Sequence, residues 1–262
     1  MSFFDSNKPI YNKINYFDLS YGSHKIRLLP EPKTIFVHYI PSSKVSIRCL
    51  GNECPICENN KLIKMQNPET YRDMPEYLGA SKRFFVNVLD KTLVKVCPFC
   101  GKENKKDLMN KYPPVCTVCS SFITDVQETV SNKVKIINFS ESIANQINSF
   151  DASILDSDGT PLGVTNFDLV LLVTPLGKKR QLSVIQDQDP ASFEAVDLES
   201  LKPFMYNLDN AVIKLSREEI VLLLGGTSLR DIFIARNKPK SDMVEDENVA
   251  NVQEELNSLF GV

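Results

Sequence analysis

Apolar and polar residues alternate along several short stretches of the chain, a pattern typical of half-buried β-strands. It predicts strands at residues 24–29, 34–40, 83–89, 134–139, 167–174 and 180–185. Between the fourth and fifth strands it predicts a helix at 140–150, with Ser140 as the N-cap and Ile143 and Ile147 on one face. The chain is therefore expected to be α+β and mainly β.

After Pro190 the strand-like alternation gives way to another pattern, which predicts short helices at 197–207 and 216–224. The second has the capping-box pattern Ser216-x-x-Glu219, and Gly225-Gly226 is expected to end it. Residues 227–235 fit either a helix or a strand. Residues 237–262 turn acidic and finish on apolar residues, which predicts a disordered arm with an apolar tip.

Six strands with a helix after the fourth suggest a small barrel of the OB type, decorated by zinc modules and short C-terminal helices. The expected boundaries are an N-terminal arm at 1–23, an OB core at 24–190, a helical C-terminal part at 191–236 and an acidic flexible tail at 237–262. Within the core, a zinc subdomain is expected at 38–80 and an inserted zinc ribbon at 96–120.

Charge is distributed unevenly behind a formal net charge of −3. Residues 1–120 carry 18 Lys and Arg against 11 Asp and Glu, whereas residues 241–262 carry six acids and no base. The N-terminus lacks the pattern of a signal peptide, and no apolar stretch approaches the roughly 20 residues that span a bilayer. We therefore expect a soluble protein in a reducing compartment. In such a compartment paired cysteines indicate metal ligands more often than disulfides.

Four of the seven cysteines form a zinc-ribbon pattern, Cys97-Pro-Phe-Cys100 followed by Cys116-Thr-Val-Cys119. Two thiolates from one tight turn can meet the same ion, and two such pairs complete a tetrahedral site. Gly101 fits a position with positive φ beneath the first pair. The alternative is a redox pair or buried free thiols.

The other three cysteines are Cys49, Cys54 and Cys57. They supply three thiolates, whereas a structural zinc site has four ligands. His38 is the nearest nitrogen donor, and its use gives eight ligands for two zinc ions per chain. If His38 is instead a hydrogen-bonded strand residue, Glu53 or a water is the fourth ligand.

Catalytic motifs are missing from the sequence. It contains no H-E-x-x-H, Walker loop or G-x-S-x-G, and His38 lacks the H-x-E spacing of nucleotide deaminases. Both zinc sites are expected to be filled by protein ligands, which leaves no open position for a reaction. We therefore expect structural zinc and no enzyme activity.

Basic and aromatic residues are interleaved over the front half of the chain and at one predicted hairpin turn. This is the composition of a surface for single-stranded nucleic acid, in which cations follow the phosphates and exposed rings stack on bases. By strand alternation, one of Phe84 and Phe85 is expected to face the core. The candidate DNA-binding residues are Tyr39, Lys44, Arg48, Lys61, Lys64, Tyr71, Arg72, Tyr77, Lys82, Arg83, Phe84, Phe85, Lys178, Lys179 and Arg180.

The chain resembles the single-stranded DNA-binding (helix-destabilising) proteins of T4-type bacteriophages. The resemblance spans roughly residues 24–186 and rests on these segments: Ile26–Pro30, Val37–Ile40, Cys49-Leu50-Gly51 with Cys54–Cys57, Lys82–Leu89 and Gly163–Phe167. It implies an OB fold with one zinc held by His38, Cys49, Cys54 and Cys57. It also implies a DNA cleft at the Lys82–Phe85 strand and an acidic tail at 245–255 that recruits replication and recombination proteins.

Two features depart from that family's pattern. The ribbon at 97–119 has no counterpart in it, and the basic N-terminal arm that drives cooperative polymerisation is not recognisable in MSFFDSNKPIYNK. Self-association on DNA is therefore left open.

The sequence thus predicts a nonspecific single-stranded DNA-binding protein for phage replication, recombination and repair, in the cytoplasm of an infected bacterium. The alternative is a transcription or replication factor whose ribbon docks on a polymerase or on duplex DNA. The acidic tail is expected to compete with DNA for the positive surface.

Overall fold

The computed structural model describes residues 14–237, apart from 102, 105–114, 117, 123–126 and 178. Most of the expected N-terminal arm, most of residues 102–114 of the expected ribbon, the tail from residue 238, and Lys178 lie outside the described residues. The chain divides into two compact units. The first takes the residues up to Lys33 and Phe84–Ala211, and the second takes Thr34–Arg83 and the residues from Val212.

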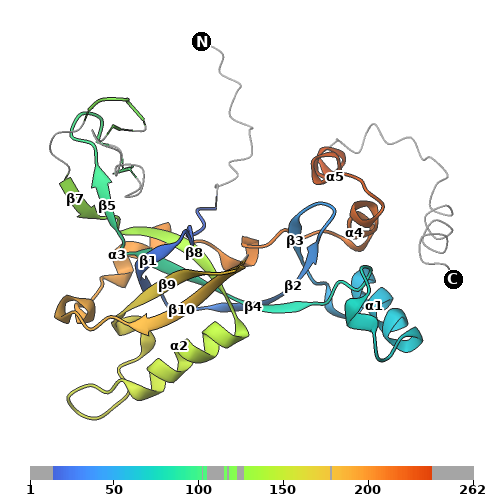
Figure 1. Ribbon diagram of the computed structural model, residues 1–262, viewed down its shortest axis with the longest axis horizontal. Helices are drawn as coiled ribbons and strands as arrows, with labels where there is room; N and C mark the ends of the chain where they lie inside the picture. Colours follow the sequence, from blue (N-terminus) through green and yellow to red (C-terminus); the bar gives the residue numbers. More distant parts are fainter. Residues whose placement is uncertain are drawn as a thin grey trace. The chain divides into compact units, whose positions relative to one another are not determined.

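The first unit is built on five strands in the order β10-β9-β1-β4-β8 (Figure 1). These strands are β1 (Gly22–Leu28), β4 (Ser81–Asp90), β8 (Lys133–Ser140), β9 (Asp168–Leu176) and β10 (Lys179–Gln186). The pairs β1·β4, β1·β9 and β9·β10 are antiparallel. Each of the five contains most of a strand that the alternation pattern predicts.

Helix α2 (Glu141–Ser153) lies between β8 and β9 in the chain and packs against both β8 and β10. Ser140 occupies its N-cap position, although its side chain makes no capping hydrogen bond. Ile143 and Ile147 are buried in the main core, together with Val86 and Val88 of β4. Within the described residues no ladder joins β8 to β10, so the closed barrel expected from the sequence is not found.

The other side of β4 is covered by the chain after β10. This segment contains η5 (Pro190–Phe193), α3 (Leu198–Leu201), η6 (Lys202–Phe204) and η7 (Leu208–Asn210), and η4 (Val164–Asn166) precedes β9. A second apolar cluster joins Leu29, Leu89 and Val134 to partly buried side chains of residues 196–206. The helix expected at 197–207 is shorter than predicted because Pro203 has no N–H to continue it.

A buried ion pair fixes the start of this covering segment. Arg27 is 1% exposed, and its Nε donates to Asp168 Oδ1 at 2.6 Å. Its Nη1 also donates to the carbonyl of Glu194 at 3.1 Å. Nearby, Lys25 pairs with Asp187 at 2.6 Å. Because each buried charge has a partner, the segment after β10 is attached to β1 and β9 by polar contacts as well as by apolar packing.

A three-stranded sheet lies in the chain between β4 and β8. Its order is β6-β5-β7, from β5 (Leu93–Val96), β6 (Glu103–Asn104) and β7 (Gln127–Val130). Because β4 and β8 pair with each other, this module extends from the connection between two neighbouring strands.

The second unit combines β2 (Lys33–Ile40) and β3 (Val45–Arg48), which pair antiparallel, with η1 (Gly51–Glu53), α1 (Pro55–Gln66) and η2 (Tyr71–Asp73). Two helices from the far end of the chain, α4 (Arg217–Leu224) and α5 (Leu229–Arg236), complete it. A core of Ile40, Ile47, Ile56, Ile220 and Leu223 joins the two chain segments.

The ends of α4 match the sequence expectation. Ser216 and Glu219 form the capping box, and Gly226 adopts φ 95° after the last turn. Residues 227–235, left open between helix and strand, are largely helical in α5. Within the described residues, no helix has the length and apolar character needed to cross a membrane.

Candidate metal centres and basic aromatic surfaces

The first candidate metal centre collects ligands from a strand pair and a helix start. His38 lies on β2, Cys49 follows β3, Cys54 is the N-cap of α1 and Cys57 is in its first turn. The positive end of the helix dipole favours the thiolate form of cysteines placed there. Pro55 occupies the first helical position, where its missing N–H leaves no hydrogen bond unmade.

The four donor atoms of this centre lie at distances suited to a shared ion. His38 Nε2 is 3.4 Å from Cys54 Sγ and 3.5 Å from Cys57 Sγ, and Cys49 Sγ is 3.5 Å from Cys57 Sγ. In a tetrahedral site with metal–sulfur bonds of about 2.3 Å and metal–nitrogen bonds of about 2.0 Å, neighbouring ligands are about 3.5 Å apart. The cluster therefore has the size of a tetrahedral metal site, with His38 as the fourth donor.

The other ring nitrogen of His38 is held by the backbone. Nδ1 lies 2.7 Å from the carbonyl oxygen of Leu78, so it carries the proton and leaves Nε2 free to bind a cation. Asn60 of α1 holds the same residue, because its Nδ2 donates to Leu78 O at 2.9 Å and its Oδ1 accepts from Leu78 N at 3.1 Å. The side chain of His38 is thus fixed in one tautomer and one orientation.

The protonation state of His38 suits a bound cation, whereas the thiol of Cys57 must lose its proton to bind one. Burial lowers the pKa of His38, although the hydrogen bond to Leu78 opposes this, so the imidazole is neutral at pH 7. Burial and the neighbouring thiols raise the pKa of Cys57 to about 12 when no cation is present. A bound cation would stabilise the thiolates directly, so metal binding and proton release are coupled.

The second candidate centre is the ribbon, built from two turns of the same form. Gly101 N donates to Cys97 O and Ser120 N donates to Cys116 O, both at 2.9 Å. Gly101 has φ 65°, as its position predicts, and Ser120 has φ 59° at the equivalent place in the second turn. Each turn therefore ends in a left-handed residue that folds the chain back beneath its two thiols.

The four ribbon thiols converge without forming disulfides. Cys97 Sγ lies 3.8 Å from Cys119 Sγ, and Cys100 Sγ lies 3.7 Å from Cys116 Sγ. These separations far exceed the disulfide length of about 2.05 Å and match the edges of a tetrahedron of metal-bound sulfurs. Cys119 is exposed, and hydrogen bonding with Ser121 lowers the pKa of its thiol.

The structure thus brings all eight sequence-predicted ligands into two groups of four, which can hold two metal ions. The groups are His38 with Cys49, Cys54 and Cys57, and Cys97 with Cys100, Cys116 and Cys119. Within each group all donor atoms lie within 4.8 Å of one another.

The C-terminal helices support the first centre in a way that the sequence did not reveal. Arg217 of α4 donates to both carboxylate oxygens of Glu58, at 2.8 and 2.6 Å, and to the carbonyl of Glu53 at 3.0 Å. Glu58 follows Cys57 directly in α1. This paired contact lowers the pKa of Glu58 and links α4 to the turn that carries the ligands.

Four of the candidate DNA-binding residues meet in one cluster of the second unit. The rings of Tyr71 and Tyr77 pack edge to face, with centroids 4.9 Å apart. Lys64 Nζ and the guanidinium carbon of Arg72 lie 5.6 and 5.5 Å from the centroid of Tyr71. Gly79 leaves room for this packing, because a Cβ there would come within 3.2 Å of the Tyr77 ring. We call these four side chains the Tyr71 cluster.

A second pairing of ring and cation lies in the first unit. The guanidinium of Arg180 on β10 lies 5.2 Å from the ring centroid of Tyr21, and its Nη1 donates to the carbonyl of Leu19 at 3.0 Å. Both side chains are exposed. Sequence reasoning selected Arg180 but missed Tyr21, whose one signal is its place just before a predicted strand.

The remaining candidates occupy mixed environments. Tyr39 is 53% exposed, and Lys44, Lys61 and Lys179 are also exposed. Arg48, Lys82, Arg83 and Phe84 are half-buried. Phe85 is only 4% exposed, so its ring is closed to a base, and the half-buried ring of Phe84 packs against the main core. Lys178 lies outside the described residues.

Comparison with protein-family models found no match. No curated protein matched the chain either.

Proposed function

We propose that this chain is a sequence-nonspecific single-stranded DNA-binding protein, braced by two structural zinc ions. The observation that carries the proposal is the Tyr71 cluster, which places two packed rings beside two cations within 20 residues of the candidate metal ligand Cys57. Stacking on an aromatic ring contributes about 1–3 kcal/mol per base and tolerates any base, while neighbouring cations neutralise the phosphates.

The strand order supports an OB barrel as the frame. The first unit runs strand, strand, strand, helix, strand, strand, and its pairs β1·β4, β4·β8, β1·β9 and β9·β10 are those of a five-stranded OB barrel lacking one closing pair. OB folds are partly open barrels that bind oligonucleotides over their second and third strands and at the loops after the first and fourth strands. In this chain the connection after β1, the first strand of the unit, contains the Tyr71 cluster. The loop after β9, its fourth strand, precedes Lys179 and Arg180 of β10.

Zinc is the ion proposed for both centres. Its preference for four sulfur and nitrogen ligands in a tetrahedron fits one set of three thiols with an imidazole and one set of four thiols. Because each set already supplies four protein ligands, a structural role is favoured over a catalytic one. The chain is accordingly proposed to have no enzyme activity.

The likeness to T4-type phage proteins supports the same function, because the first centre uses His38, Cys49, Cys54 and Cys57 in the chain order of that family. We propose that the chain is a relative that acts in DNA replication, recombination and repair in an infected bacterium. Its acidic tail would recruit partner proteins. The ribbon would be an addition to the common frame.

A second function is favoured by one feature of the ribbon. Phe99 is 66% exposed, Val118 60% and Phe122 65%, so apolar side chains surround both metal-binding turns. An exposed apolar group of this kind is typical of a surface that docks on another macromolecule. The alternative is therefore a replication or transcription factor whose ribbon binds a polymerase or duplex DNA.

Fluorescence anisotropy with labelled oligo-dT and with a duplex of equal length tests the two functions together. Single-stranded DNA binding predicts tight binding to oligo-dT at low salt and weaker binding to the duplex. No detectable oligo-dT binding at low salt would refute the proposal. Preference for a defined duplex would favour the second function.

A further inference from the structure

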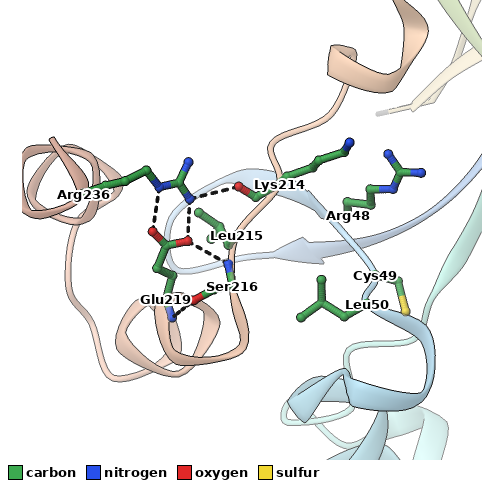
Figure 2. Close-up of a pocket in the computed structure, with 8 residues that line it drawn as sticks. All are labelled: Arg48, Cys49, Leu50, Lys214, Leu215, Ser216, Glu219 and Arg236. Atoms are coloured by element: carbon green, nitrogen blue, oxygen red, sulfur yellow. Dashed lines mark hydrogen bonds and ion pairs between the residues drawn. The ribbon is translucent and has the colours of Figure 1, made fainter.

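A hollow in the second unit is bordered by three cations from distant parts of the sequence. It has a volume of about 620 Å³ and lies among the end of β3, residues 214–216, α4 and α5 (Figure 2). Arg48, Lys214 and Arg236 line it, together with the apolar side chains of Leu50 and Leu215. Only Arg48 among the cations was selected from the sequence.

The one carboxylate in the lining is already engaged by neighbours. Glu219 accepts hydrogen bonds from Nε of Arg236 at 2.7 Å and from the backbone N–H of Ser216 at 2.7 Å, and it also contacts Arg236 Nη2. These contacts lower the pKa of Glu219, so it stays ionised and holds the guanidinium of Arg236 in place. The hollow therefore carries an excess of positive charge with Arg236 fixed at one side.

The chain at Lys214 is fixed by contacts with both Arg236 and β3. Arg236 Nη2 donates to the carbonyl of Lys214 at 3.1 Å. Arg48 N donates to Ile213 O at 2.9 Å, and Ile47 and Ile213 form a parallel bridge, so the chain beside Lys214 is tied to β3. Arg48 is followed directly by Cys49, a ligand of the first centre. In Figure 2 the side chains of Arg48 and Lys214 extend in the same direction, away from the Arg236–Glu219 pair.

We propose that this hollow is a binding site for a phosphodiester group of the single strand, contacted by Lys214 and Arg48 with Arg236 at its rim. The inference rests on the proposed function and extends it to residues of the C-terminal helices. A phosphate is the ligand that suits Arg48 and Lys214, whose side chains extend in the same direction, because it accepts several charge-assisted hydrogen bonds at once. The partly buried side chain of Leu50 gives the sugar an apolar surface to contact.

Lys214→Gln tests the site, with Arg230→Gln as the matched control. Arg230 is an exposed cation of α5 that does not line the hollow, so both variants lose one charge from the same unit. The affinity for oligo-dT is measured over a salt series. Loss of one phosphate contact should weaken binding several-fold and reduce the slope of log K against log salt by about 0.7.

Arg230→Gln should keep the slope of the unmodified protein, and Lys214→Arg should restore it. Equal effects of the two glutamine variants, or no effect of Lys214→Gln, would overturn the site while leaving the proposed function intact. Absence of oligo-dT binding by the unmodified protein would instead refute the function itself. Unchanged metal content and thermal unfolding of Lys214→Gln establish that the variant is folded.

Inorganic phosphate distinguishes the source of the ligand. At matched ionic strength, phosphate should compete with oligo-dT no better than chloride, because the backbone presents its phosphates together with stacked bases. Specific competition by phosphate that Lys214→Gln abolishes would mean that the hollow takes free phosphate, and would overturn its assignment to the nucleic-acid backbone.

Discussion

The ring of Tyr77 meets the ring of Tyr71 at an angle of 79°, with their centroids 4.9 Å apart. Edge-to-face packing of this kind adds about 0.5–1.5 kcal/mol beyond the burial of the rings, so each ring restrains the other. Arg72 Nε donates to the hydroxyl of Tyr71 at 3.0 Å and fixes the pair further. A rigid ring beside cations loses little entropy when a base stacks on it.

Tyr71→Ala is expected to weaken binding to oligo-dT by about fivefold to more than a hundredfold, because it removes stacking worth about 1–3 kcal/mol. Tyr71→Phe keeps the ring and should stay close to the unmodified protein. Anisotropy titration at fixed salt measures both.

Phe204→Ala provides the control for loss of an exposed ring, since Phe204 is 66% exposed in the first unit. It should leave the affinity unchanged. If Tyr71→Ala binds as tightly as Phe204→Ala, the Tyr71 cluster does not contact bases.

Metal analysis should find two zinc ions per chain. Cys97→Ser should lower the count to one and leave oligo-dT binding measurable, because the ribbon is a separate module. Cys54→Ser should also lower the count to one but abolish binding, since Cys54 is buried in the core of the second unit. Equal binding by the two variants would contradict the different roles assigned to the centres.

Asn60→Ala is expected to weaken metal binding at the first centre by about tenfold without removing a ligand. It frees the Leu78 peptide that orients His38, and loss of such supporting contacts typically lowers metal affinity 10–100-fold. Competition with a chromogenic chelator measures the change. Asn59→Ala, at the preceding position of α1, is the control, and an equal loss in both variants would show a general effect on the helix.

Removing residues 241–262 should tighten binding to single-stranded DNA at low salt. The deleted segment carries six acids and no base, so it competes with phosphates for the positive surface. The gain should vanish at high salt, where such charges are screened. An affinity unchanged by the deletion at low salt would contradict tail competition.

Local patterns in the sequence were sufficient to predict the main strands and the two clusters of candidate metal ligands. Alternation identified the strands that became β1, β2, β4, β8, β9 and β10, and C-x-x-C spacing gave the six paired thiols. Gly101 was predicted to adopt positive φ and has φ 65°. Helix α1 was missed because only Pro55, Ile56 and Ile63 of it are buried, which leaves a weak apolar period.

Contacts between distant residues could not be predicted in the same way. Arg27 interrupts the apolar strand His24–Leu29 and would normally point to solvent, yet it is buried against Asp168, 141 residues away. Arg217 meets Glu58 across 159 residues. Single-sequence patterns report periodicity and turn chemistry, whereas such pairings depend on which segments the fold brings together.

The binding of oligo-dT across a salt series tests the central claim most directly. The account predicts tight binding at low salt and a linear fall of log K against log salt, with a slope of about −0.7 for each phosphate contacted. Several contacts are expected, so the slope should be well below −1. No binding at low salt, or an affinity that does not change with salt, would contradict the claim that this chain binds single-stranded DNA.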